Sequence, residues 1–105
     1  MPKRLVFRAA SREDAKAIAD HYWEAAGEQI ALRFIDALQH TYLSIEKNPL
    51  LGSMRYSVVA NMPGLRSRRI PRFPYLVFYA VEEERIQVAR ILHERRDLPA
   101  ILRPL

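Results

Sequence analysis

The side chains best suited to chemistry in this sequence are arginines, and five of them are concentrated in one segment. Residues 53–81 contain five arginines and no carboxylate: Arg55, Arg66, Arg68, Arg69 and Arg72. The flanking segments, residues 1–52 and 82–105, each hold equal numbers of basic and acidic residues, so the net charge of +5 lies in this one segment. Because a guanidinium group makes bidentate contacts with phosphates and carboxylates, the segment predicts an anionic partner, either a nucleic acid or an acidic protein. The alternative is a solvated strand edge that charge keeps soluble.

A second group of polar residues lies around Arg90, near the end of the chain. In a strand, Arg90 would share one face with Ile86, Val88 and Leu92 and would interrupt an apolar pattern. An arginine buried there without a partner would cost several kcal/mol. The residues that follow form a dense polar cluster: His93, Glu94, Arg95, Arg96 and Asp97. We therefore expect either a structural ion pair at Arg90 or a binding edge where this strand ends.

The sequence does not indicate metal, nucleotide or acid–base chemistry. It has no cysteine, no glycine-rich phosphate-binding loop and no serine-hydrolase motif, and its three histidines, His21, His40 and His93, are far apart. We therefore expect no metal and no cofactor, and we expect the three glutamates at 82–84 to form an exposed turn. The longest apolar run, residues 75–81, is too short to span a bilayer, and no secretion signal is present. The protein is expected to be cytoplasmic and to have no membrane partner.

The elements that must position these residues begin with a strand and two helices. An apolar run at residues 5–8 predicts the strand. The capping-box spacing of Ser11 and Asp14 predicts that a helix begins at Ser11, and Gly27 is placed to end it. A second amphipathic period follows and stops at Asn48 and the proline after it. Because the turn between the two helices is short, we expect them to lie antiparallel.

Three strands are expected in the second half of the chain. Residues 65–70 alternate loosely, and residues 75–81 are apolar on both faces, which is typical of a central strand. Residues 85–93 follow the glutamate turn, so the two longer runs predict an antiparallel hairpin. Residues 94–105 form a charged junction and a short apolar tail. Together these elements predict a single α+β domain over residues 1–105, with an N-terminal strand, an antiparallel helical hairpin and a mainly antiparallel three-stranded sheet.

Five short motifs follow one another along these elements. They are Ala31-x-x-Phe34-Ile35, Asn48-Pro49-x-x-Gly52, Gly64-Leu65-Arg66, Tyr75-x-x-Phe78-Tyr79 and Val88-x-Arg90-Ile91-Leu92-His93-x-Arg95-Arg96-Asp97. In this order and at this spacing, the motifs resemble the RelE/ParE superfamily of type II toxin-antitoxin toxins, and the ParE branch (plasmid stabilisation proteins) in particular. The resemblance extends over about residues 5–102.

The resemblance to the ParE branch implies a toxin that inhibits DNA gyrase by binding it directly. It also implies a cognate antitoxin that neutralises the toxin, forms a hetero-oligomer with it and wraps its surface with an acidic C-terminal segment. On this interpretation the protein has no catalytic residue. An inactive homologue that only binds its antitoxin is a further alternative.

The RelE branch implies another activity, metal-independent cleavage of mRNA in the ribosome. Such a nuclease would use Arg66, Arg90, His93 and Arg95. The sequence departs from that branch, because Leu76 and Ile101 fall where a RelE-type nuclease has a catalytic arginine and a C-terminal tyrosine. Only Arg95 matches a RelE-type catalytic position, which favours the ParE interpretation.

Eight residues are predicted to bind a partner: Arg66, Arg68, Arg69, Arg72, Arg90, His93, Arg95 and Arg96. We expect the acidic antitoxin segment to dock near Arg66, Arg68 and Arg69, which have no carboxylate close by in the sequence. The helical hairpin offers a second, apolar docking surface. Direct contact with nucleic acid stays open at this stage.

Overall fold

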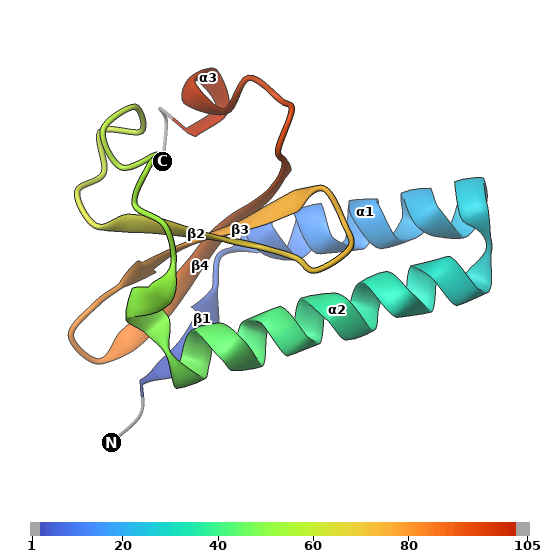
Figure 1. Ribbon diagram of the computed structural model, residues 1–105, viewed down its shortest axis with the longest axis horizontal. Coiled ribbons are helices and arrows are strands. Elements are labelled where there is room, and N and C mark those ends of the chain that lie inside the picture. The colour runs from blue at the N-terminus through green and yellow to red at the C-terminus, as the bar shows by residue number, and fades with distance from the viewer. Residues whose placement is uncertain (1–2, 103–105) are drawn as a thin grey trace.

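A four-stranded sheet forms the centre of the protein, whose computed structural model describes residues 3–102 (Figure 1). The strands are β1 (Arg4–Phe7), β2 (Leu65–Arg69), β3 (Tyr75–Val81) and β4 (Arg85–His93), and they lie in the order β1-β4-β3-β2. β3 is antiparallel to both of its neighbours, whereas β1 joins the edge of the sheet parallel to β4. The predicted α+β fold and its order of elements are confirmed.

The helices α1 (Ala9–Ala26) and α2 (Glu28–Lys47) run antiparallel on one face of the sheet (Figure 1). Gly27 joins them with a φ of 92°, and its N–H donates to the carbonyl oxygen of Trp23, which ends α1 as predicted. α2 ends at Lys47, directly before Asn48, also as predicted. Within residues 3–102, none of the helices is long and apolar enough to cross a membrane.

The predicted capping box at the start of α1 is wrong. α1 begins at Ala9, two residues before Ser11, and no side chain caps it. The Ser11 hydroxyl is buried and donates to the carbonyl oxygen of Arg8, while the Asp14 carboxylate is bound to β4. The spacing that predicted a cap therefore arises from two side chains that are occupied elsewhere.

Each face of the sheet carries its own apolar cluster. Side chains of α1 and α2, including Ile18, Phe34 and Leu38, pack on Val77 and Tyr79 of β3. The opposite face has a second cluster, whose members are Ala60, Leu65, Leu76, Phe78, Leu92, Leu98 and Leu102. Residues 53–64 and the short helix α3 (Leu98–Leu102) supply the cover on that side. The sequence pattern predicted only an apolar tail here, because a helix of five residues is too short to show a period and depends on tertiary burial.

A β-bulge in β4 changes which residues share a face. Phe78 pairs with Arg90 but Tyr79 pairs with Val88, so Ala89 is the extra residue. Val88 consequently faces the helices, whereas Leu92 belongs to the cluster on the opposite face. The expectation that Arg90 shares one face with Ile86, Val88 and Leu92 is therefore wrong, because the bulge shifts the alternation by one residue.

The chain leaves α2 through a tight passage beside Tyr79. The short 3-10 helix η1 (Pro49–Leu51) follows α2, and the Tyr79 hydroxyl donates to the carbonyl oxygen of Pro49 at 2.7 Å. A Cβ atom on Gly52 would lie 2.8 Å from Cζ of Tyr79 and 3.1 Å from Cβ of Arg66. Gly52 has a φ of −67°, which any residue adopts. Position 52 therefore needs glycine because there is no space for a side chain, and not because of its backbone conformation. Burial beside this passage raises the pKa of the Tyr79 hydroxyl.

We predict that Gly52→Ala lowers the free energy of unfolding by about 1–3 kcal/mol, because the added methyl group overpacks the contact with Tyr79. Urea denaturation of the wild type and the variant would measure this difference. Tyr79→Phe removes the hydroxyl that lies closest to Gly52, so the alanine should cost less in a Tyr79→Phe background. Strictly additive effects of the two substitutions would contradict a steric origin.

Candidate functional site

Two of the predicted partner-binding arginines lie on the helix face of β2 and donate hydrogen bonds within the protein, although Nη1 of Arg68 is buried with no partner among residues 3–102. Arg66 and Arg68 pair with residues of β3 whose side chains face α1 and α2. The Arg66 Nη1 donates to the carbonyl oxygens of Leu50 and Gly52, both at 2.9 Å, and the Arg68 Nη2 donates to Oγ of Ser44 in α2 at 2.7 Å. These contacts fix the end of α2 and η1 to the sheet, which gives both arginines a structural role.

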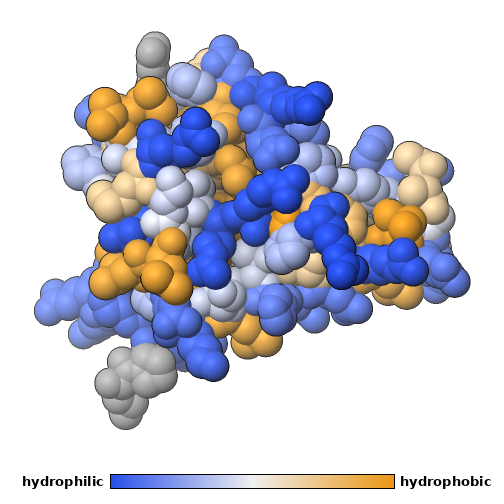
Figure 2. Space-filling view, in the orientation of Figure 1, coloured by the Kyte–Doolittle hydropathy of each residue, from blue (hydrophilic) through white to orange (hydrophobic). Residues whose placement is uncertain are grey.

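Arg69 points to the other face of the sheet, where it joins two further arginines. Its Nε donates to Glu94 at 3.0 Å, and this hydrogen bond lowers the pKa of Glu94. Arg55 and Arg95 line the same cavity of about 510 Å³, and the Arg55 guanidinium lies 5.2 Å from the ring centre of Tyr56. Figure 2 shows strongly hydrophilic side chains gathered over β2 and the turn after it. Three arginines and one carboxylate leave this cavity cationic.

Arg90 forms the ion pair that the sequence offered as one of two alternatives. Its Nε and Nη2 donate to the two carboxylate oxygens of Asp14 in α1, at 2.8 and 3.0 Å. Pairing of β1 with β4 ends at Val88, and beyond it the Asp14 carboxylate also accepts the N–H of Ile91 at 2.9 Å. The Arg90 side chain is 25% exposed and that of Asp14 is 15% exposed. Asp14 therefore replaces a neighbouring strand at this part of the sheet edge and ties α1 to β4.

His93 and Arg96 line a separate cavity between α1 and β4. It has a volume of about 320 Å³ and also includes His21 and Tyr75. The His93 ring packs edge-on against Tyr75, with ring centres 5.2 Å apart, and its Nδ1 accepts the backbone N–H of Arg95 at 3.0 Å. In neutral His93 the proton is therefore on Nε2. The ring is held in place by both contacts.

The structure does not gather the residues that the nuclease alternative requires, namely Arg66, Arg90, His93 and Arg95. Arg66 lies opposite Tyr79, and His93 lies opposite Tyr75, which is four residues or about 13 Å away along β3. Arg90 is bound to Asp14. Within residues 3–102, no group of three or more metal-binding side chains is close enough to hold an ion.

An apolar groove lies between α1 and α2, and Phe7 of β1 lines it as well. This helical groove, of about 380 Å³, is lined by Phe7, Ala15, Ile35 and Tyr42 among others. A neighbouring cavity of about 430 Å³ shares Phe7 and Tyr42 and adds Leu43, which is 64% exposed. Burial raises the pKa of Tyr42 to about 12, so its ring contributes a neutral surface. The helical groove is the apolar surface that the sequence analysis expected on the hairpin.

Two residues of these surfaces were not singled out as site residues by the sequence analysis. Asp14 was interpreted as a helix cap, although the charge of Arg90 required a carboxylate from elsewhere in the chain. Arg33 was not among the predicted residues, yet it lines a cleft with Arg72, which lies in the turn after β2. No periodicity could have found either contact, because both join segments that are far apart in the sequence.

Comparisons with known proteins agree with this geometry. The family model for the ParE toxin of the type II toxin-antitoxin system parDE matches residues 5–98. A solved structure described as the chromosomal ParDE TA system from P. aeruginosa superposes with a TM-score of 0.73 at 25% sequence identity, covering 87% of this chain and 95% of that chain. No curated protein matches the sequence.

We predict that Asp14→Asn lowers the free energy of unfolding by about 1–3 kcal/mol, because Arg90 keeps its charge in a largely buried position without a carboxylate. The matched control is Asp20→Asn, since Asp20 pairs with Lys16 where both side chains are more than half exposed. That control should change stability by less than about 0.5 kcal/mol. Denaturant titrations that give equal losses for the two variants would refute the structural role of Asp14.

Proposed function

The chain belongs to the ParE toxin family of type II toxin-antitoxin systems, and from this we propose that it inhibits DNA gyrase by direct binding and is neutralised by a cognate antitoxin. The observation that carries the proposal is the family match, which extends over residues 5–98. Inhibition by binding needs exposed surfaces rather than a catalytic centre, and the cationic cavities and the helical groove are such surfaces. The proposal places the protein in the cytoplasm, where gyrase acts on DNA.

Two positions support binding over mRNA cleavage. Leu76, which stands where a RelE-type nuclease has an arginine, is buried in the cluster on the face opposite the helices. Ile101, which stands in place of the C-terminal tyrosine, packs against the same cluster. Both positions contribute to the core, so neither offers a group that stabilises charge on a phosphate or transfers a proton.

The antitoxin has two kinds of surface available on this protein. The helical groove suits an amphipathic helix, because its apolar side chains would fill the space between α1 and α2. The arginines outside the structural contacts attract an acidic segment through charge complementarity. Antitoxin affinity on this account contains an apolar part and an electrostatic part.

We predict that the purified protein, at micromolar excess over DNA gyrase, inhibits supercoiling of relaxed plasmid DNA, and that an equimolar amount of antitoxin restores it. Gel electrophoresis of the plasmid topoisomers measures both effects. Primer extension on translated mRNA should show no cuts in phase with codons after expression in cells. Full supercoiling at micromolar excess would count against gyrase as the target, and codon-phased cuts would favour the nuclease.

We predict that Leu43→Asp weakens antitoxin binding by about tenfold or more. Leu43 lines the cavity that adjoins the helical groove, where a helix bound along the groove would desolvate the new carboxylate. Leu50→Asp is the matched control, because Leu50 in η1 is 66% exposed and lies outside the helical groove. Isothermal titration calorimetry compares the two variants with the wild type. Equal losses of affinity would show that the helical groove is not the docking surface.

A further inference from the structure

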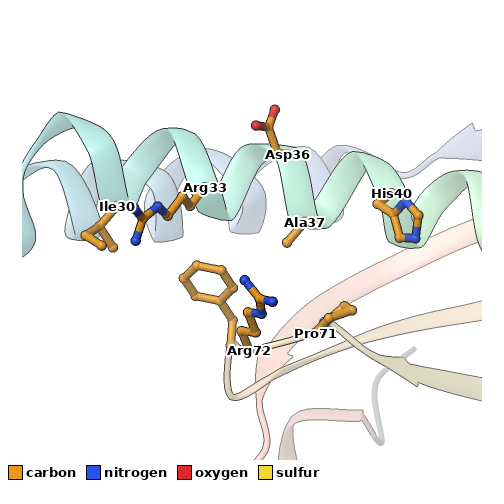
Figure 3. A pocket seen from close by; sticks show the side chains of 8 residues that line it. Ile30, Arg33, Asp36, Ala37, His40, Pro71 and Arg72 are labelled. Carbon is orange, nitrogen blue, oxygen red and sulfur yellow. The ribbon is translucent and has the colours of Figure 1, made fainter.

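A cleft between α2 and the turn that joins β2 to β3 carries two arginines, and neither forms an ion pair with any residue of the range 3–102. The turn cleft has a volume of about 700 Å³ and is lined by eight residues: Ile30, Arg33, Asp36, Ala37, His40, Pro71, Arg72 and Phe73. In Figure 3, Arg33 extends from α2 and Arg72 rises from the turn, and both side chains project into the space between these elements. The molecule thus places two cations from distant segments at one cavity.

The charge of the turn cleft is not balanced within the part of the chain that the structure describes. None of its four ion pairs includes Arg33 or Arg72. Asp36 also lines the cleft, but within residues 3–102 its carboxylate forms no ion pair with either arginine, and in Figure 3 it projects away from Arg72. His40 also lines the cleft, but its imidazole ring carries no negative charge that could balance the arginines. Two guanidinium groups at one cavity repel each other until an anion binds between them.

The backbone conformation of Arg72 indicates that the turn does not require an arginine side chain at this position. Arg72 has a φ of 70°, the left-handed region that favours glycine. Two hydrogen bonds close this turn without the Arg72 side chain: the Ile70 N–H donates to Tyr75, and the Phe73 N–H donates to Ile70. Glycine would satisfy the same turn with less strain. An arginine at this position therefore needs another explanation, and the unbalanced cleft supplies one.

The walls of the turn cleft restrict the kind of anion that fits. Ile30 and Ala37 of α2 face Pro71 and Phe73 of the turn, so half of the residues that line the cleft are apolar. The Phe73 ring is fixed by edge-on packing against Phe34, with ring centres 5.3 Å apart. A bare phosphate would leave these walls in contact with water, and Pro71 has no N–H to donate to it. A carboxylate next to an apolar side chain fits both features.

We propose that the turn cleft binds an acidic segment of the antitoxin, in which a carboxylate meets Arg33 and Arg72 while a neighbouring apolar side chain packs on Phe73. This inference rests on the proposed function, because it takes the antitoxin as the partner. The electrostatic part of antitoxin binding is thereby placed at the turn cleft, between α2 and the turn after β2, and not on the face of the sheet.

The turn cleft and the helical groove lie on different sides of α2. Arg33, Ala37 and His40 line the first, whereas Ile35 and Tyr42 line the second. Because successive residues of a helix are rotated by about 100°, these two sets are separated by nearly half a turn around α2. A path around half of a helix about 10–12 Å wide requires roughly five or six extended residues. We expect a spacer of at least this length between the apolar and acidic parts of the antitoxin.

The test compares a double variant, Arg33→Gln with Arg72→Gly, with the wild type. Calorimetric titration with the purified full-length cognate antitoxin should show a loss of affinity of about tenfold or more and a weaker dependence on salt. The melting temperature should stay unchanged or rise, because glycine relieves the strain at position 72 and glutamine is a good helix former. The control is Arg4→Gln with Arg85→Gln, which removes the same charge from neighbouring exposed positions of β1 and β4.

The possible results distinguish a failure of the cleft assignment from a failure of the proposed function. If the double variant keeps wild-type affinity and wild-type salt dependence, the turn cleft is not the binding site, while the proposed toxin function is unaffected. An equal loss in the control variant would also overturn it, since net charge alone would explain the effect. If the wild type does not bind the antitoxin, the proposed partner and the cleft assignment both fail. Binding of a single-stranded oligonucleotide that is lost in the double variant, with antitoxin affinity unchanged, would assign the cleft to nucleic acid.

Discussion

Burial of β3 on both faces is the constraint on which the rest of the structure depends. Val77 and Tyr79 pack under the helices, and Leu76 and Phe78 pack under the loop and α3 on the other side. A strand of this kind requires two covers, and the chain must carry its second cover around the edge of the sheet. It does so directly after α2, where Ser53 bridges to Ser67 of β2 and the residues that follow reach the far face. Gly52 stands where this crossing passes closest to Tyr79.

This crossing explains how several of the motif residues are used. Backbone carbonyls at the end of a helix need donors, and here they come from the Tyr79 hydroxyl and the Arg66 guanidinium. At β4 the roles are reversed: the Asp14 carboxylate accepts hydrogen bonds from the Ile91 N–H and from Arg90, at the strand edge that β1 leaves open. Arg66 and Arg90, both in motifs that resemble the ParE branch, thus hold the elements together. Arg33 and Arg72 lie outside those motifs and form no ion pair within residues 3–102.

More of the fold than of the candidate site could be predicted from the sequence. Alternation and turn residues locate β3, β4 and the end of α2 correctly, because those signals act over a few neighbouring residues. The bulge at Ala89 could not be predicted, since it is defined by the pairing of β4 with β3, two strands whose register the sequence does not show. α3 also depends on tertiary burial. The Arg90–Asp14 ion pair joins residues that are 76 positions apart, and a single sequence does not show which carboxylate a buried arginine will find.

The position of α2 connects folding with recognition. Phe34, Leu38 and Ile45 are buried against the sheet, and this stripe fixes the rotation of α2 about its axis. That rotation places the helical groove on one side of α2 and the turn cleft on another, so both surfaces exist only when the core is packed. A partner that binds both surfaces recognises the folded state and not the unfolded chain, and its binding free energy adds to the stability of the toxin. Loosening the contacts of α2 with the sheet would therefore lower stability and antitoxin affinity together, whereas substitutions at the turn cleft alone would separate the two.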